Sequence, residues 1–124
     1  MLTVAEIDRS LHFYQHALGM AAEHFVTPSG SKRWALRFGN AKINLHQHGQ
    51  EFEPKAAHPT PGSADLCFLT QTPLAKWVAH LHAQNVEIED GPVSRTGAAG
   101  PIMSLYLRDP DQNLIEISVP HDVS

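Results

Sequence analysis

Apolar residues recur every three to four positions in one early stretch of the chain, which is the period of a helix with one buried face. These residues are Ile7, Leu11, Tyr14 and Leu18, and Gly19 follows them as a residue that readily ends a helix. The pattern therefore predicts an amphipathic helix over residues 7–18.

A second stretch has the same period. Thr72 is expected to cap its start, Pro73 suits the first turn, and Asn85 suits the left-handed conformation that often follows a helix. The apolar face of this second predicted helix comprises Leu74, Trp77, Val78 and Leu81.

Segments with the composition of β-strands surround both helices. One segment precedes each helix and three follow it, separated by turns rich in Gly, Pro, Asn and Asp. In the first half the expected strands are residues 1–4, 21–27, 33–38 and 41–46, and in the second half they are residues 65–70, 86–89, 102–108 and 113–119. The order strand, helix, three strands thus occurs twice.

This repeat predicts the domain organisation. We expect one α+β domain over residues 1–124, made of two βαβββ half-repeats at residues 1–48 and 64–119. The intervening linker, residues 49–63, is rich in proline and charge and is expected to border the functional site. A chain of this length suffices for a single hydrophobic core.

Composition narrows the classes of function. The formal net charge is −4 and no basic face is evident, which argues against a nucleic-acid partner. No apolar run approaches the ~20 residues of a membrane span, and the first residues lack the pattern of a signal peptide. Cys67 is the single cysteine and is expected to be a small buried apolar residue. We therefore expect a cytoplasmic protein without a membrane partner.

Several sequence patterns resemble one known superfamily. V-x-x-I-x-x-S-x-x-F-Y-x-x-x-L-G-M at residues 4–20 and R-D-P-D-x-N-L-I-E-I at residues 108–117 are similar to the two ends of the glyoxalase, bleomycin-resistance and dioxygenase superfamily, also called the vicinal oxygen chelate superfamily. Its glyoxalase domain-containing protein 5 type is the nearest in likeness, through I-N-L-H at 43–46, E-F-E-P-K at 51–55 and P-G-S-A-D-L-C at 61–67. The resemblance implies an eight-stranded sheet curled into a cup, with the helices outside.

The resemblance also implies a divalent-metal site inside the cup. Superfamily enzymes take ligands from four inward positions, which here fall on Asp65, Asn44, Glu116 and a position on the first strand of the first half. His46, on the same strand face as Asn44, is an alternative because an amide oxygen is a weak ligand. The expected metal is Zn, Ni, Mn, Co or Fe, and Glu116 is also the expected catalytic carboxylate. Without a metal, Glu116 would be an ion-paired strand residue.

The fourth ligand position falls outside the sequence. By the repeat, the partner of Asp65 lies two residues before Met1, where the superfamily commonly has His. A coding start assigned too late, a strand partly left out of the sequence and a natural loss of the ligand would each account for this. We expect the 124-residue chain to bind metal poorly or not at all, and a version extended upstream to bind it well.

These residues favour a metal-dependent lyase or isomerase that stabilises an enediolate-type intermediate of a small oxygenated or thiol-conjugated substrate. Trp34 and Phe52 are expected to form an apolar wall for this substrate, and Arg95 an anion contact, although core aromatics and surface bases are the commoner roles of such residues. A metal-free drug-binding module of the bleomycin-resistance kind is the alternative. An iron-dependent ring-cleaving dioxygenase is disfavoured, because Asp65 stands where a second His is needed. We also expect a homodimer.

Overall fold

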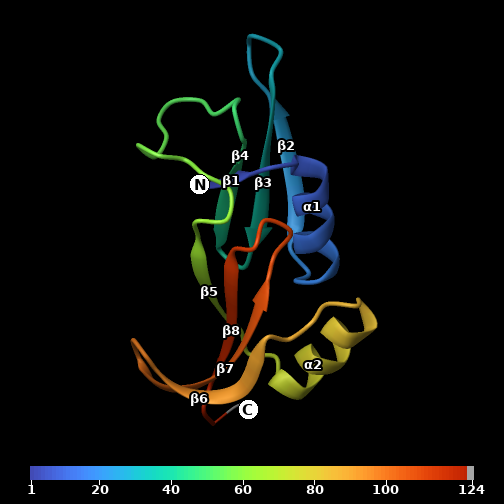
Figure 1. Cartoon of the computed structure of the whole chain (residues 1–124), viewed down its shortest axis with the longest axis vertical. Helices are drawn as coiled ribbons and strands as arrows, with labels where there is room; N and C mark the ends of the chain where they lie inside the picture. Colours follow the sequence, from blue (N-terminus) through green and yellow to red (C-terminus); the bar gives the residue numbers. More distant parts are fainter. Residues whose placement is uncertain (123–124) are drawn as a thin grey trace. The chain divides into compact units, whose positions relative to one another are not determined.

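A computed structural model describes residues 1–122 of the chain, and Figure 1 shows its elements. Contacts between residues divide the chain into two compact units, the first over residues 1–64 and the second beginning at Asp65. The boundary falls at the expected start of the second half-repeat, while the linker belongs to the first unit. Residues 123 and 124 of the expected domain lie outside the described residues.

The first unit is a βαβββ arrangement with one mixed four-stranded sheet. Its strand order is β1-β4-β3-β2, in which β1 and β4 are parallel and the other neighbours antiparallel. The elements are β1 (Leu2–Val4), α1 (Ile7–His16), β2 (Ala21–Val26), β3 (Lys32–Phe38) and β4 (Ala41–Gln47).

The second unit repeats this arrangement. Its strand order is β5-β8-β7-β6, with β5 and β8 parallel and the other neighbours antiparallel. The elements are β5 (Asp65–Leu69), α2 (Leu74–Ala83), β6 (Asp90–Gly97), β7 (Gly100–Arg108) and β8 (Leu114–Pro120). The α+β class and the double βαβββ pattern are confirmed.

Strand register identifies which positions of the two units are equivalent. In the first unit Asn44 of β4 lies opposite Ala35 of β3, and in the second unit Glu116 of β8 lies opposite Tyr106 of β7. Glu116 also lies opposite Cys67 of β5. Each of Asn44 and Glu116 follows an isoleucine on the last strand of its unit. The two residues therefore occupy equivalent positions, as the repeat predicts.

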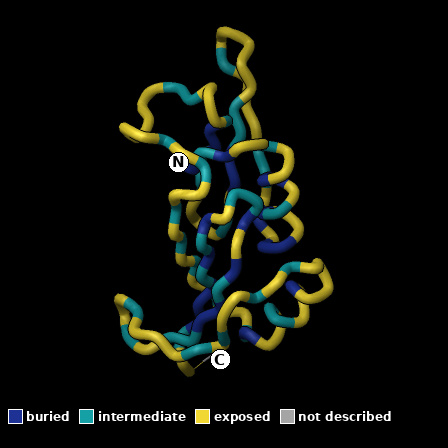
Figure 2. The backbone as a smooth tube through the Cα atoms, in the orientation of Figure 1, coloured by how far each residue is buried: buried dark blue, intermediate teal, exposed yellow. Residues whose placement is uncertain are grey.

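Each sheet buries the face expected from alternation. On β8, Ile115, Ile117 and Val119 are almost fully buried, and Figure 2 shows the buried stretches of the backbone. In the first unit Leu36 and Leu45 are buried in the same way, together with Leu11 and Tyr14 of α1. Burying these side chains stabilises each unit by about 1.5–3 kcal/mol per large residue. The opposite sheet faces are left to carry the polar residues.

Three expectations about local structure are wrong. Helix α1 ends at His16 rather than at Leu18, because Ala17 already forms its C-cap. Thr72 does not cap α2: the N-cap is Pro73, and the Thr72 backbone N–H instead donates to Thr70 Oγ1. Cys67 is exposed rather than buried, because it lies on the polar face of β5.

The expected strand at residues 86–89 is also wrong, since β6 begins only at Asp90. Gly91-Pro92 is a turn signal in sequence, yet here it lies inside a strand. Two features allow this. Strand β6 is at the edge of its sheet, where a proline removes no needed hydrogen bond, and the register shifts between Asp90 and Val93. Gly91 has a φ of +106°, and a Cβ there would lie 2.4 Å from the Ser104 carbonyl oxygen, so glycine is required.

The left-handed residue expected after α2 is confirmed, with Asn85 at a φ of 58°. Gln112, in the turn before β8, has a φ of 70°. Within the described part of the chain, neither helix has the length and apolar character needed to cross a membrane.

Candidate functional site

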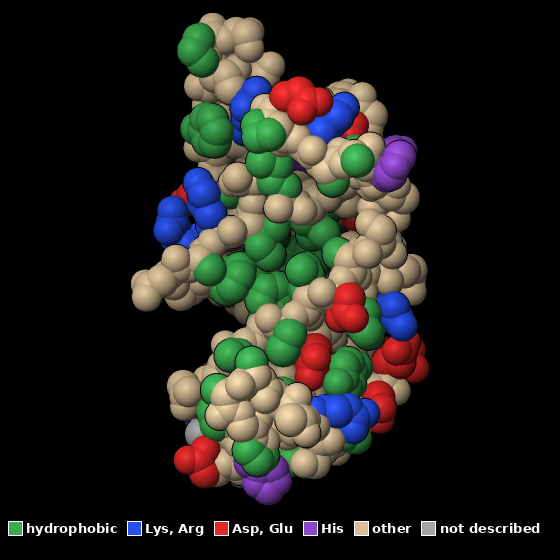
Figure 3. Space-filling model, turned by 90° about the vertical axis from the view of Figure 1, so that its left-hand side faces the viewer, with side chains coloured by type: hydrophobic (Ala, Val, Ile, Leu, Met, Phe, Trp, Pro, Cys, Tyr) green, Lys and Arg blue, Asp and Glu red, His purple; other side chains and the backbone are tan. Residues whose placement is uncertain are grey.

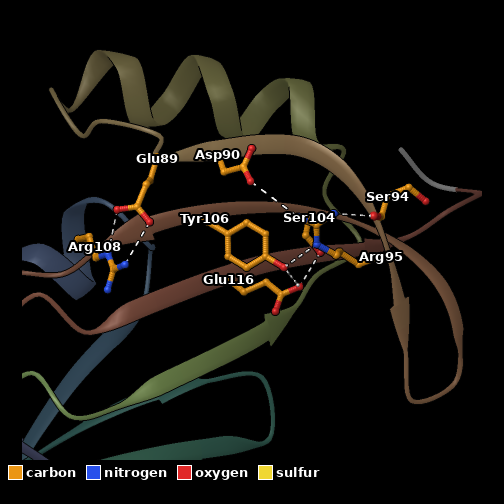
Figure 4. Close-up of polar contacts among 8 residues, drawn as sticks. All are labelled: Glu89, Asp90, Ser94, Arg95, Ser104, Tyr106, Arg108 and Glu116. Carbon is orange, nitrogen blue, oxygen red and sulfur yellow. Dashed lines mark hydrogen bonds and ion pairs between the residues drawn. The ribbon is translucent and has the colours of Figure 1, made fainter.

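The polar face of the second sheet is organised around the carboxylate of Glu116 (Figure 4). Three hydroxyl groups lie within hydrogen-bond distance of its Oε2 atom: Ser104 at 2.7 Å, Ser118 at 3.1 Å and Tyr106 at 3.2 Å. Ser104 and Ser118 are fully buried, and their hydroxyl oxygens lie 2.8 Å apart. Because each hydroxyl has a single proton, a serine that donates to the other does not also donate to Glu116. Charge-assisted hydrogen bonds of this kind hold the carboxylate in one orientation.

The hydroxyl contacts of Glu116 involve one of its two carboxylate oxygens. All three hydroxyl contacts are with Oε2. The Cys67 thiol also interacts with this carboxylate, which helps to raise the pKa of Cys67 after the larger effect of burial. A carboxylate oxygen has lone pairs for further bonds, either to a hydrogen-bond donor or to a metal ion. Glu116 is therefore a carboxylate oriented through Oε2, and none of the three hydroxyl contacts involves Oε1.

Asp65 lies on the same sheet face as Glu116. It is in register with Leu114, which stands two residues before Glu116 on β8, and it is exposed. The Asp65 carboxylate is near enough to Arg108 to help raise the pKa of that guanidinium, after the larger contribution of Glu89. The second sheet thus presents two of the predicted metal ligands on one face.

Arg95 of β6 is held next to this cluster. Its Nε donates to the Tyr106 hydroxyl at 3.2 Å, its guanidinium lies 5.5 Å from the centre of the Tyr106 ring, and Asp90 lies 3.7 Å from its Nη2. Figure 4 shows the Tyr106 hydroxyl hydrogen-bonded both to Arg95 and to Glu116. Its side chain is still 44% exposed, so it can meet an anionic group from solvent.

In the first unit, Asn44 and His46 share the polar face of β4. Asn44 is half-buried, whereas His46 is only 2% exposed and its Nε2 atom has no hydrogen-bond partner within residues 1–122. Burial is the largest cause that holds the pKa of His46 below its ordinary value of 6.5, and the N-terminal amine adds to this. His46 is consequently a neutral imidazole near pH 7, the form that binds a metal or donates one hydrogen bond.

The ring of Phe52, from the linker, covers His46. The two ring centres are 4.1 Å apart, and the guanidinium carbon of Arg33 lies 3.5 Å from the centre of the same phenyl ring. Extending the β3–β4 register by one residue beyond Trp34 and Leu45 places Arg33 directly opposite His46. The Nε atom of Arg33 is also buried without a hydrogen-bond partner in the described chain.

Trp34 does not share a face with these residues. It pairs with Leu45, so it lies on the helix-facing side of the sheet, where its ring is 4.7 Å from that of His24. Of the three predicted substrate contacts, the structure places Phe52 against His46 and Arg95 against the Glu116 cluster, and it places Trp34 on the other face of the first sheet from His46.

The predicted metal ligands are therefore present as separate donors. Glu116 and Asp65 share the face of the second sheet, and Asn44 and His46 share that of the first. Among residues 1–122, no three His, Cys, Asp or Glu side chains gather in a group that could hold a metal ion. Taken separately, the carboxylate of Glu116 and the unpartnered Nε2 of His46 are donor types that Zn, Ni, Mn, Co and Fe accept.

Sequence reasoning missed the hydroxyl groups that hold Glu116. Ser104 and Tyr106 alternate with the buried Leu105 and Leu107 on β7. Polar residues at every second position of an otherwise apolar strand form a signal for a polar sheet face. That signal shows which residues face each other, but only the register shows that their hydroxyls meet one carboxylate.

Charged side chains of both signs are interspersed on the surface drawn in Figure 3. Lys and Arg groups lie mostly beside Asp or Glu groups there. This face does not present a continuous basic patch.

Comparisons with known proteins agree on one family. The pattern of the Glyoxalase/Bleomycin resistance protein/Dioxygenase superfamily matches residues 1–117. The chain is 54% identical over 118 residues to virulence protein STM3117 of Salmonella typhimurium, covering 95% of this chain and 79% of that protein. It is 49% identical over 122 residues to glyoxalase domain-containing protein RDO1 of Mycosarcoma maydis, covering 98% of this chain and 66% of that protein.

Solved structures support the same assignment. A protein from the mobile metagenome of V. pseudocholerae superposes with a TM-score of 0.88 at 54% identity, covering 95% of this chain and 88% of the other. Two more distant structures share the fold alone. One is lactoylglutathione lyase from Agrobacterium tumefaciens (22% identity, TM-score 0.67, 95% and 88% covered), and the other is TnmS3, an antibiotic binding protein from Streptomyces (20%, 0.73, 96% and 90% covered). The expected resemblance is confirmed, and the chain belongs to the glyoxalase/bleomycin resistance protein/dioxygenase superfamily.

Proposed function

We propose that this protein is a metal-dependent lyase or isomerase that acts on a small oxygenated or thiol-conjugated substrate. The observation that carries the proposal is Glu116, whose carboxylate is oriented through Oε2 by three hydroxyl contacts, none of which involves Oε1. A preorganised carboxylate suits both metal binding and the transfer of a proton to or from a substrate carbon.

Each proposed ligand has a role that follows from its chemistry. Glu116 and Asp65 would hold the metal as oxygen donors, with Asn44 or His46 as the donor from the first unit. A bound divalent ion supplies a Lewis acid for a carbonyl or enediolate oxygen. Glu116 would carry the proton, and Ser104, Tyr106 and Ser118 would keep its carboxylate oriented while it does so. Arg95 would contact an anionic part of the substrate.

The test is metal content by plasma mass spectrometry after dialysis against Zn, Ni, Mn, Co or Fe. The version extended upstream is the one to be tested. In it, Glu116→Ala is expected to abolish metal uptake and Asn44→Ala to reduce it less, because a carboxylate is the stronger ligand. Glu23→Ala, which removes an exposed carboxylate paired with Arg37, is the matched control. Equal metal content in the wild type and in Glu116→Ala would overturn the assignment of Glu116 as a ligand.

A metal-free binding module is the second candidate. It is favoured by the lack of any three clustered donors among residues 1–122, and the fold is shared with an antibiotic binding protein. In that case the protein would retain a ligand fully in the presence of a chelator, and Glu116→Ala would change neither metal content nor affinity. Loss of ligand binding on chelation would instead support the enzyme.

We further propose that the protein is a cytoplasmic homodimer. Paired copies would cover sheet edges, and symmetric dimers are the commonest small assemblies. Light scattering at micromolar concentration tests this, and a monomeric mass would contradict it.

A further inference from the structure

We propose that Arg33 and His46 form a binding site for an aromatic carboxylate, whose carboxylate would bridge the two side chains and whose ring would replace that of Phe52. This inference goes beyond the proposed function, because it names a ligand class for the first unit and requires no metal.

Two buried nitrogen atoms without partners point to a missing acceptor. Arg33 Nε and His46 Nε2 are both shielded from solvent and lack hydrogen-bond partners within residues 1–122. Buried polar groups in folded proteins are nearly always hydrogen-bonded, so two unpaired ones on neighbouring strands need an explanation. The register places Arg33 opposite His46, and both side chains contact the ring of Phe52, so the two unpaired groups lie at one place on the sheet face.

In the second unit, the residues equivalent to Arg33 and His46 contact a carboxylate of the protein itself. Because Trp34 pairs with Leu45 and Leu105 pairs with Ile117, Arg33 and His46 correspond to Ser104 and Ser118. Those two serines both lie within hydrogen-bond distance of the carboxylate of Glu116. In the first unit the position of Glu116 holds Asn44, so the protein supplies no carboxylate to its own pair of donors. A ligand carboxylate would supply it.

The charges around His46 suit an anion. Arg33 and Lys55 both act on its pKa as positive charges, and Glu51 is the opposing acid. Glu51 is also engaged elsewhere, since its Oε1 accepts the Gly49 backbone N–H at 3.1 Å. A neutral imidazole with its proton on Nε2 and the guanidinium N–H would then both donate to the ligand.

Phe52 shows that the place accepts an aromatic ring. Its phenyl ring lies against the His46 imidazole and under the Arg33 guanidinium, contacts that an arene ring of a ligand would reproduce. Phe52 belongs to a stretch without helix or strand, and its neighbours Glu53 and Pro54 are exposed. Displacement of this side chain therefore disrupts no sheet or helix.

The experiment is titration calorimetry of the full chain with benzoate in the presence of EDTA. Benzoate is expected to bind, and benzyl alcohol, which has the ring without the charge, at least about tenfold more weakly. Arg33→Gln should weaken benzoate binding about tenfold or more. Phe52→Ala should strengthen it several-fold, because the competing ring is gone. Arg37→Gln is the matched control: it removes a guanidinium of the same strand, whose partner is Glu23, and should leave binding unchanged.

Circular dichroism of each variant shows whether it is folded, and the His46 ring resonances in an NMR titration locate the ligand. Absence of benzoate binding to both the wild type and Phe52→Ala would overturn the proposal, as would equal binding by Arg33→Gln. Because the measurement excludes metal and leaves Glu116 unchanged, its failure is distinct from failure of the proposed metal-dependent function.

Discussion

The polar faces of the two sheets differ although their strands repeat the same register. In the second unit, Ser104, Tyr106 and Ser118 all meet the carboxylate of Glu116. In the first unit, the positions equivalent to the serines are Arg33 and His46, which meet no acceptor within residues 1–122. The polar groups around Glu116 in the second unit are hydrogen-bonded to one another. In the first unit, the ring of Phe52 covers His46 instead.

The difference shows that two repeats with the same register can provide different chemical groups to a ligand. A carboxylate fixed by three hydroxyl groups is a preorganised functional group, since little further ordering is required when a ligand arrives. A pair of donors without an acceptor is instead destabilising by itself and becomes favourable only when a partner is supplied. The second unit thus provides an oriented group for chemistry, and the first unit provides the place that selects a ligand.

Substitution of the equivalent residues Glu116 and Asn44 by leucine is the strongest test of this comparison. Glu116→Leu should lower the free energy of unfolding by about 3 kcal/mol, because three hydroxyl groups lose their shared acceptor and two of them are buried. Asn44→Leu should change it by less than about 1 kcal/mol, because no hydrogen bond of Asn44 is lost in the described chain.

Urea unfolding followed by circular dichroism measures both values. Glu116→Gln keeps one oxygen acceptor and serves as the control, with an expected loss of about 1 kcal/mol. Similar losses for Glu116→Leu and Asn44→Leu would mean that the hydroxyl cluster does not distinguish the two faces.

The buried imidazole of His46 predicts a smaller effect that depends on pH. Its folded pKa lies below 6.5, chiefly because of burial, so below pH 6.5 the unfolded chain binds the proton more readily than the folded chain. Stability should therefore fall as the pH drops from 6.5 towards the folded pKa, and this contribution should be absent above pH 6.5. Urea midpoints between pH 7.5 and pH 5 measure the slope.

His46→Gln should reduce that slope, and the same substitution of the exposed His82 is the control for loss of a histidine. Benzoate should flatten the dependence on His46 if the ligand binds where we propose, because a carboxylate beside the imidazole favours its protonated form in the folded state. A slope unchanged by His46→Gln would show that the burial of this imidazole has no energetic consequence.

The repeat and the fold class could be predicted because they depend on periodic patterns. Alternation on β8 placed Glu116 opposite to Ile115 and Ile117, and the register bears out that separation of faces. Strand β6 was misplaced because Gly91-Pro92 has the sequence of a turn, and only the edge position of the strand makes it acceptable. The preference of residues for a turn depends on those residues alone, whereas the position of a strand in its sheet depends on pairing with distant parts of the chain.

The candidate site was harder to predict because its contacts join distant residues. Alternation could place Ser118 on the face of Glu116, but the convergence of three hydroxyls on one oxygen depends on the β7–β8 register. Likewise, Phe52 lies in an irregular segment without any period, so its contact with His46 has no signal in the sequence. Trp34 was expected near the site, although alternation along β3 puts it on the face of Leu36.

The smallest expected difference concerns a pair of salt bridges that the repeat preserves. Arg37 of β3 bonds Glu23 through two contacts of 3.1 Å, and the equivalent Arg108 of β7 bonds Glu89 through contacts of 3.0 and 3.1 Å. Each arginine lowers the pKa of its glutamate through these hydrogen bonds. All four side chains are substantially exposed, so solvent screens both pairs. Neither pair should contribute much to stability.

Arg108 nevertheless has one contact that Arg37 lacks. Its Nη1 donates to the carbonyl oxygen of Gln112 at 3.2 Å, in the turn where Gln112 is left-handed. Arg37→Lys is therefore expected to leave the urea midpoint unchanged within error, because a surface ion pair survives in part with lysine. Arg108→Lys should lower it slightly but reproducibly, since lysine lacks the planar fork that bonds Glu89 and the turn together. Gln112→Gly would separate the two causes, because glycine removes the cost of the left-handed backbone and keeps the carbonyl acceptor. If the shift for Arg108→Lys matched that for Arg37→Lys, the turn contact would add nothing, and these two positions would be equivalent in energy as well as in register.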